Sequence, residues 1–326
     1  MTLASKPKQK KTLGNCAHSA LQKHLKKTVK WEAAVKKDKD PEALHQMRVG
    51  MRRLRTTVTS FAPALDLPKA VSNKNIGKIA RCLGNLRDLD VLKETLENIY
   101  RPRLSRKEQE QLQVALDVLK EQREDALSDV KATLKNERYK SLKGKLQEWL
   151  EEPTYQPLGN MAIEQVLPDL LLPEISEFFL HPGWLIGTQL QETEIVISKN
   201  WKAAKVEQQL SEKGETLHSL RKQAKRLRYQ MELFSDIYDE PYTAYIEEIK
   251  NIQEILGGMQ DSVVLAGWLT HALKSDVQTQ FPTLATLLAE NRYQLWQQWQ
   301  PLQERYLKVE TRHEFHSMVL DTGNRG

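Results

Sequence analysis

Two eleven-residue stretches of the sequence concentrate basic side chains at helical spacing. The first stretch runs from His45 to Arg55 and the second from His218 to Arg228, and neither contains an acidic residue. In both, a histidine is followed by cations three, seven, eight and ten positions later. On a helix with 3.6 residues per turn, most of these side chains fall along one side. We define two basic ladders: the first is His45, Arg48, Arg52 and Arg55, and the second is His218, Arg221, Lys225 and Arg228.

The chemistry that such a ladder can perform is the binding of an anion. Like charges three or four positions apart on a helix repel by a few tenths of a kcal/mol per pair, and solvated basic faces normally interleave glutamate. Neither ladder does so, which favours a ligand that supplies the negative charge over a merely solvated face. Arginine, which predominates, binds two phosphate oxygens at once through its planar fork. Each histidine either donates to the ligand or bonds a backbone carbonyl near the start of its helix.

The charge of the chain is unevenly distributed. The net charge is +6, but acidic residues outnumber basic ones outside the two stretches and the lysine-containing first eleven residues. This pattern predicts a bounded basic site rather than a diffusely basic surface. The most apolar segment, 163–185, is interrupted by acidic residues and prolines, and the N-terminus shows no signal peptide. We therefore expect a cytoplasmic protein that does not span a membrane.

Other motifs that could carry chemistry are weak. The chain shows no glycine-rich phosphate loop, nucleophile elbow or zinc-protease motif. Asp88 and Asp90 have the residue type of metal ligands, but only Asp261 recurs in the second half, so we expect the aspartates to orient the ladders. His313 and His316 have helical spacing for a metal but fall in a polar segment. The sequence therefore predicts no catalytic residue, no metal and no cofactor.

The resemblance between the two basic stretches extends beyond them. Residues 44–92 align with residues 217–265 without a gap, at a constant offset of 173 positions and with 16 identities. The matches include the pairs Leu83-Gly84 and Leu256-Gly257 near the end of the aligned segment. A shared offset over this length indicates an internal duplication, in which two similar units pack about a pseudo-two-fold axis.

Apolar periodicity predicts an all-α protein with four helices in each half. Asp40 and Pro41 form a helix start, as N-cap and first helical residue. Gly214 holds the corresponding place in the second half, and no segment shows the alternation of period two that a strand needs. The expected helices cover 12–37, 41–62, 69–99 and 105–151, then 186–211, 215–237, 241–275 and 282–309. The other expected segments are a basic flexible tail (1–11), a proline-rich linker with one or two short helices (152–183) and a polar tail (311–326).

The two ladders, with the segments 83–91 and 256–261 that follow them, resemble the CHAD family, the conserved histidine α-helical domain. The resemblance covers about residues 12–310, as one domain with halves 12–151 and 184–310. It implies two four-helix bundles and a basic channel between them that binds inorganic polyphosphate, at polyphosphate granules in bacteria. The channel residues of the family correspond to the eight ladder residues. This sequence departs from the family at Gln260, where an arginine is expected before Asp261.

The function expected from these observations is non-catalytic polyphosphate binding. A second group of cations is expected to add to the site: Lys26, Arg53, Lys78, Arg81, Lys199, Lys222 and Arg226. One rival function is nucleic-acid binding, although Tyr229 is the only aromatic residue beside a ladder that could stack on a base. The other rival is an enzyme that acts on phosphate chains, which is disfavoured because the sequence shows no general base with a nucleophile beside it and arginine cannot serve as the base.

Overall fold

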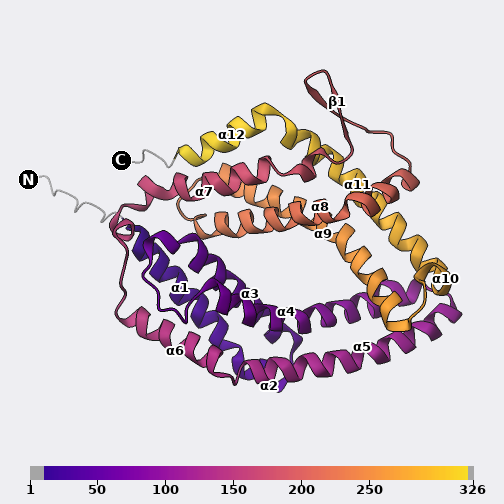
Figure 1. Cartoon of the computed structure of the whole chain (residues 1–326), viewed down its shortest axis with the longest axis horizontal. Coiled ribbons are helices and arrows are strands. Elements are labelled where there is room, and N and C mark those ends of the chain that lie inside the picture. Colours follow the sequence, from indigo (N-terminus) through magenta and orange to yellow (C-terminus); the bar gives the residue numbers. More distant parts are fainter. Residues whose placement is uncertain (1–10, 322–326) are drawn as a thin grey trace, which may run out of the picture. The chain divides into compact units, whose positions relative to one another are not determined.

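The computed structural model describes residues 11–321 and is all-α apart from one short hairpin (Figure 1). This architecture confirms the predicted fold class. The basic tail expected at residues 1–11 lies, except for Lys11, outside the described residues. No helix in the described part is long and apolar enough to cross a membrane.

The chain forms two compact units. Unit 1 contains residues 1–84 and 129–170, and unit 2 contains residues 85–128 and 171–326. These units do not coincide with the halves expected at 12–151 and 184–310, because three helices contribute residues to both units. Those helices are α4 (Asn73–Glu94), α5 (Arg106–Thr133) and α7 (Ile163–Phe179).

Four α-helices of the described part belong wholly to unit 1. They are α1 (Leu13–Lys30), α2 (Glu32–Lys37), α3 (Pro41–Ser60) and α6 (Glu137–Glu151). All of them except α2 begin at a polar side-chain cap. Asp40 accepts a hydrogen bond from the backbone N–H of Glu42, with Pro41 at the first helical position, as predicted. Two expected helices are each divided: 12–37 breaks at Trp31, and 105–151 breaks before Asn136, which caps α6.

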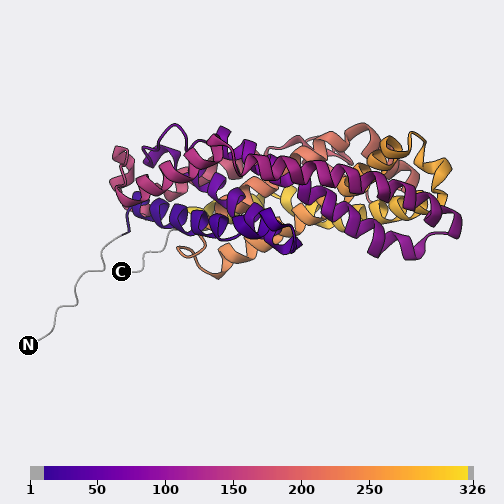
Figure 2. The ribbon, with the colours of Figure 1, turned by 90° about the horizontal axis from the view of Figure 1, so that it is seen from below.

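The core of unit 1 is centred on the packing of α1 against α3 (Figure 2). Their buried side chains include Ala17 and Leu21 from α1 and Met47 and Met51 from α3. The helices come closest at Gly50, where an added Cβ would lie 2.6 Å from Thr28 Oγ1. Any larger residue at position 50 would therefore push the two helices apart.

Unit 2 contains the remaining elements. They are β1 (Thr188–Gln191), β2 (Glu194–Ile197), α8 (Ala203–Leu233), α9 (Glu240–Leu273), α10 (Val277–Gln280), α11 (Pro282–Leu307) and α12 (Val309–Leu320). A stack of Trp184, Trp299 and Tyr306 fills its core beside α7. A second cluster contains Leu96 and Leu269, which are related by the 173-residue offset.

Two expectations for the segment before α8 are wrong. The helix expected at 186–211 is replaced up to residue 202 by extended chain and an antiparallel hairpin in which Thr188 pairs with Ile197 (Figure 1). The three successive β-branched residues of Glu194–Ile197 favour a strand, and Glu192 adopts a positive φ of 55° in the turn. The absence of strands was therefore also predicted wrongly.

Gly214 does not begin a helix but lies inside α8, which runs unbroken from Ala203. One glycine costs a helix about 1 kcal/mol, which the good helix formers around it offset. The expected polar tail is helical as far as Leu320, because Phe315 and Val319 are four positions apart and both are buried.

Candidate polyanion-binding site

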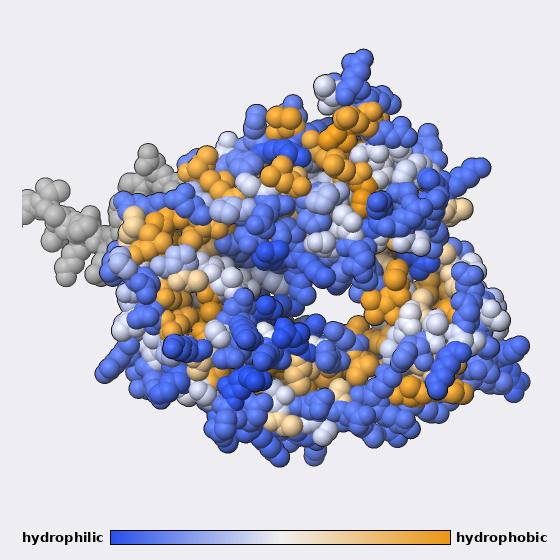
Figure 3. All heavy atoms as spheres, viewed as in Figure 1, coloured by the Kyte–Doolittle hydropathy of each residue, from blue (hydrophilic) through white to orange (hydrophobic). Residues whose placement is uncertain are grey.

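The first ladder lies on α3, on the side adjacent to its buried stripe. Leu44, Met47, Met51 and Leu54 pack into the core of unit 1. The ladder side chains are partly buried, except that of Arg55, which is exposed. Figure 3 shows strongly hydrophilic side chains gathered over α3 and the start of α4. The helix therefore holds the ladder at the surface of unit 1 by burying its neighbouring side.

Two arginines of the first ladder pack beside glycines of α4, and only Gly77 is too close to its arginine for a larger residue to fit easily. A Cβ added at Gly77 would lie 3.3 Å from Arg55 Cζ, and one added at Gly84 would lie 3.7 Å from Arg48 Nε. Arg55 Nε also donates a hydrogen bond of 2.6 Å to Asn73 Oδ1. Each guanidinium thus lies against the backbone of α4, which restricts its orientation before any ligand binds.

The second ladder repeats this arrangement on α8 in unit 2. A Cβ added at Gly257 of α9 would lie 3.0 Å from Arg221 Nε. Arg221 and Gly257 are the residues that the 173-residue offset relates to Arg48 and Gly84. Arg221 Nη2 also lies 3.9 Å from Asp261 Oδ1, which agrees with the orienting role expected for that aspartate. The contact of an arginine with a glycine therefore occurs at equivalent positions in both units.

The last rung differs between the ladders. The side chain of Arg228 is only 12% exposed, its Nη1 lies 3.6 Å from Glu232 Oε1, and its guanidinium lies 4.5 Å from the ring centroid of Tyr229. Lys250 stands at the position equivalent to Gly77. Arg228 is consequently held by residues of its own helix, whereas Arg55 lies against α4.

Burial keeps the imidazole of His218 neutral. Its pKa is lowered first by burial and then by the charges of Lys222 and Arg221, while Glu215 and Asp261 raise it. His218 Nδ1 is buried and has no hydrogen-bond partner among the described residues. The alternative that this nitrogen bonds a backbone carbonyl does not hold. His45, its equivalent on α3, is half-buried.

The aspartates after the glycines lie near the second ladder. The pKa of the Asp261 carboxyl is raised by burial and by the negative charge of Asp88, and it is lowered by Arg221. Asp90 instead accepts a hydrogen bond of 2.7 Å from Arg123 Nε. No group of three potential metal ligands occurs among the described residues. His316 hydrogen-bonds the carbonyl oxygen of Arg312 and stacks on Phe179, so it contributes to the packing of α12.

The second group of cations is dispersed. Arg226 lies 3.5 Å from Glu174 and 3.8 Å from Glu177 of α7, and Lys199 lies 2.9 Å from Glu304. Lys26 borders a groove with residues of α6. Lys78, Arg81 and Lys222 are exposed, and Arg53 is half-buried on α3.

Sequence reasoning missed a set of basic residues on α1. Lys23 and Lys27 lie close enough to Arg53 to influence the same buried imidazole, that of His24. Burial first, and then the charges of Arg53, Lys23 and Lys27, lower the pKa of His24 to about 4. The four-residue spacing of Lys23 and Lys27 was a visible signal, but only tertiary packing shows that they face α3.

One prediction follows from the contact between Arg221 and Gly257. Replacing Gly257 by alanine should weaken anion binding several-fold, because the new methyl group displaces the guanidinium. The same change stabilises the helix by up to about 1 kcal/mol. Gly267→Ala on the same helix is the matched control, since no heavy atom of the described residues lies within 4 Å of its added Cβ. Both the affinity and the melting temperature of the two variants are measured. If both variants are folded and bind with equal affinity, the orientation of Arg221 has no role in binding.

Comparisons with known proteins agree on one fold. A family model described as the CHAD domain matches residues 19–270. The structure is similar to the crystal structure of the CHAD domain from the plant Ricinus communis, with a TM-score of 0.55 and 24% identity, over 98% of this chain and 94% of that one. It is also similar to PptA from Streptomyces chartreusis, with a TM-score of 0.59 and 14% identity, over 93% and 99% of the two chains. No curated protein matches the sequence.

Proposed function

Because the chain belongs to the CHAD domain family, we propose that it binds inorganic polyphosphate through its two basic ladders and performs no reaction on it. The observation that carries the proposal is the repeated contact of Arg48 with Gly84 and of Arg221 with Gly257. Each guanidinium packs beside a glycine at an equivalent position, tightly at Gly257 and in ordinary van der Waals range at Gly84, which restricts it before the ligand arrives. Such restriction lowers the entropy that binding must remove.

The spacing of the ladder suits a linear polyanion. Cations three and four positions apart recur about every 5 Å along a helix. A polymer with negative charge on every unit can therefore contact successive rungs, with arginine forks bonding pairs of phosphate oxygens. A chain that reaches both ladders gains from tethering, because the second contact becomes intramolecular. We further propose that one polyphosphate chain binds both ladders and that this binding occurs at polyphosphate granules in the cytoplasm.

Two observations favour polyphosphate over nucleic acid and over catalysis. Tyr229, the aromatic residue beside the second ladder, is 6% exposed and lies under Arg228, so its ring is not presented to a base. The ladders offer no nucleophilic side chain beside their histidines, and arginine does not serve as a general base, so they lack the pair of groups that catalysis would need.

The test is a competition assay with labelled long-chain polyphosphate. Unlabelled polyphosphate should displace the label at concentrations at least tenfold lower, per phosphate, than single-stranded RNA or duplex DNA. The label should also keep its chain length during prolonged incubation. Displacement by RNA at the same phosphate concentration would support the nucleic-acid alternative, and shortened chains would support an enzyme.

A further inference from the structure

The packing of α1 against α3 gathers basic side chains beside the first ladder. Close approach at Gly50 and Thr28 brings together the side chains that flank this point. Lys27 directly precedes Thr28, Lys23 lies one helical turn earlier, and Arg53 follows Gly50 by three positions. We call Lys23, Lys27 and Arg53 the lateral strip. All three belong to unit 1.

The charges of the strip act on one another and on the ladder. The pKa of Lys27 is lowered first by burial and then by Arg53, and Arg52 and Lys23 lower it further. Glu42, at the start of α3, acts in the opposite direction. Arg52 is a rung of the first ladder, so the charges of the strip and of the ladder lie close enough to interact.

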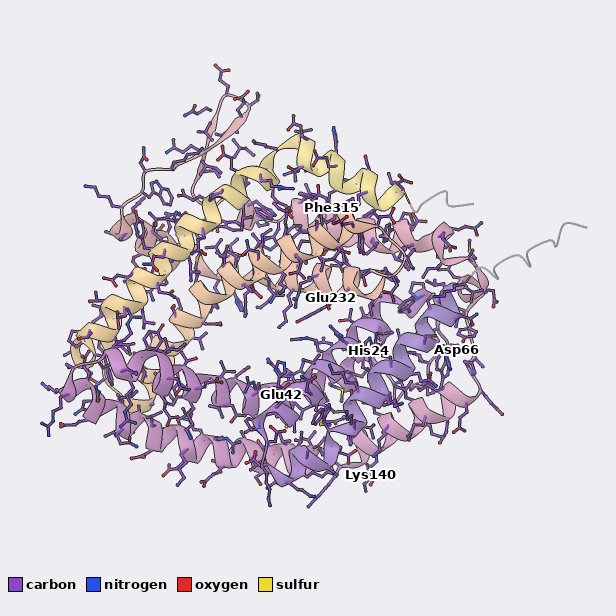
Figure 4. All side chains as sticks on the ribbon, turned by 180° about the vertical axis from the view of Figure 1, so that it is seen from behind. His24, Glu42, Asp66, Lys140, Glu232 and Phe315 are labelled. Atoms are coloured by element: carbon purple, nitrogen blue, oxygen red, sulfur yellow. The ribbon has the colours of Figure 1, made fainter. Side chains whose placement is uncertain are left out.

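A buried imidazole lies among these cations. His24 is 4% exposed, and its Nδ1 has no hydrogen-bond partner among the described residues. Figure 4 shows His24 among the packed helices of unit 1. Since its pKa is about 4, His24 adds no charge at neutral pH. Only the lysine and arginine side chains carry the positive charge of the strip.

The equivalent region of unit 2 is neutralised. Arg226, which corresponds to Arg53, lies near Glu174 and Glu177 of α7 and hydrogen-bonds the side chain of Gln223. Two carboxylates of α7 therefore lie beside Arg226, and two lysines of α1 lie near Arg53. The two ladders have unequal surroundings although their sequences match.

We propose that the lateral strip of unit 1 binds further phosphates of a polyphosphate chain whose other phosphates occupy the first ladder. This inference rests on the proposed function and adds a specificity to it. A short chain that fills the ladder does not reach the strip, whereas a long chain engages both. The strip thus makes the affinity of unit 1 depend on chain length.

The test compares Lys23→Gln/Lys27→Gln with wild type, using tripolyphosphate and long-chain polyphosphate as probes. We expect the affinity for the long chain to fall about tenfold, as for the loss of two charge-assisted contacts, and that for tripolyphosphate less than twofold. The matched control is Lys140→Gln/Lys145→Gln on α6, which removes the same charge from exposed lysines that pair with Glu137 and Glu148. It should change neither affinity by as much as twofold.

The outcomes separate the two proposals. If wild type binds no polyphosphate, the proposed function fails and the strip fails with it. If wild type binds but the double variant keeps its affinity for the long chain, only the strip is refuted. Equal losses in the double variant and the α6 control would show an effect of net charge alone and would also refute it. Lys23→Arg/Lys27→Arg keeps both positive charges and should retain binding. A loss of binding in this variant would mean that the substitutions change the structure of α1, and it would refute a role for charge alone.

Discussion

Replacing Arg48, Arg52 and Arg55 together by glutamine removes most of the affinity for polyphosphate and leaves the protein folded. Each arginine is expected to contribute a charge-assisted contact, so the triple variant should lose at least a hundredfold in affinity. Its folding should suffer little, because relief of repulsion among the rungs offsets the contacts that the arginines lose, among them the hydrogen bond from Arg55 to Asn73. Titration calorimetry measures the affinity, and thermal unfolding measures the stability.

A charge-matched variant serves as the control for this experiment. Arg103, Arg106 and Lys107 are exposed and belong to neither ladder, so their replacement by glutamine removes the same charge. It should weaken binding no more than a few-fold, through the general field of the protein. A large drop in melting temperature of the ladder variant would instead assign a structural role to its arginines.

Neutralising the second ladder should also cause a large loss, but a smaller one. From the sequence alone, equal losses are expected from the two ladders. The variant Arg221→Gln/Lys225→Gln removes two cations where the first-ladder variant removes three, and Gln260 stands beside the second ladder where the first copy has Arg87. We therefore expect Arg221→Gln/Lys225→Gln to lower the affinity about tenfold, measured as for the first ladder.

Arg228 is left unchanged in that variant because its removal would disturb the fold. Its side chain is largely buried, and without it the carboxylate of Glu232 would lose its ion pair. A loss in Arg221→Gln/Lys225→Gln as large as that of the first-ladder triple would contradict the asymmetry. No loss at all would exclude the second ladder from binding.

The helices that carry the ladders were predictable because their signals are local. The spacing of Arg48, Arg52 and Arg55 beside Met47 and Met51 defines one basic side and one buried side without knowledge of any other helix. The cap at Asp40 and Pro41 likewise depends on adjacent residues, and it is confirmed. Local signals were therefore sufficient for the fold class and for placing the ladders on their helices.

What the sequence did not predict depends on contacts distant in the chain. The carboxylates near Arg226 come from α7, about fifty residues earlier, and nothing near Arg226 signals them. The helix that contains Phe315 forms through burial against Phe179 and Tyr245. The sequence signal for the hairpin at 188–197 is local but weak, because the rest of the chain has the apolar periodicity of helices.

The departure at Gln260 remains visible beside the second ladder. Its equivalent, Arg87, precedes Asp88 in α4, so the first copy carries a cation that the second lacks. Together with Glu174 and Glu177, this difference makes the surroundings of the second ladder less basic. The duplication inferred from the sequence does not require the two copies to bind equally, and we do not expect them to.

The most direct test of the central claim is the stoichiometry of binding to polyphosphate of one defined length, measured by calorimetry at several salt concentrations. We expect one long polyphosphate chain to bind per protein molecule, with an affinity that falls steeply as the salt concentration rises because the contacts are ionic. Neutralising either ladder should leave one chain bound, more weakly and with a shallower dependence on salt. Two chains bound per wild-type protein, falling to one at unchanged affinity when a ladder is neutralised, would contradict the claim that one chain engages both ladders.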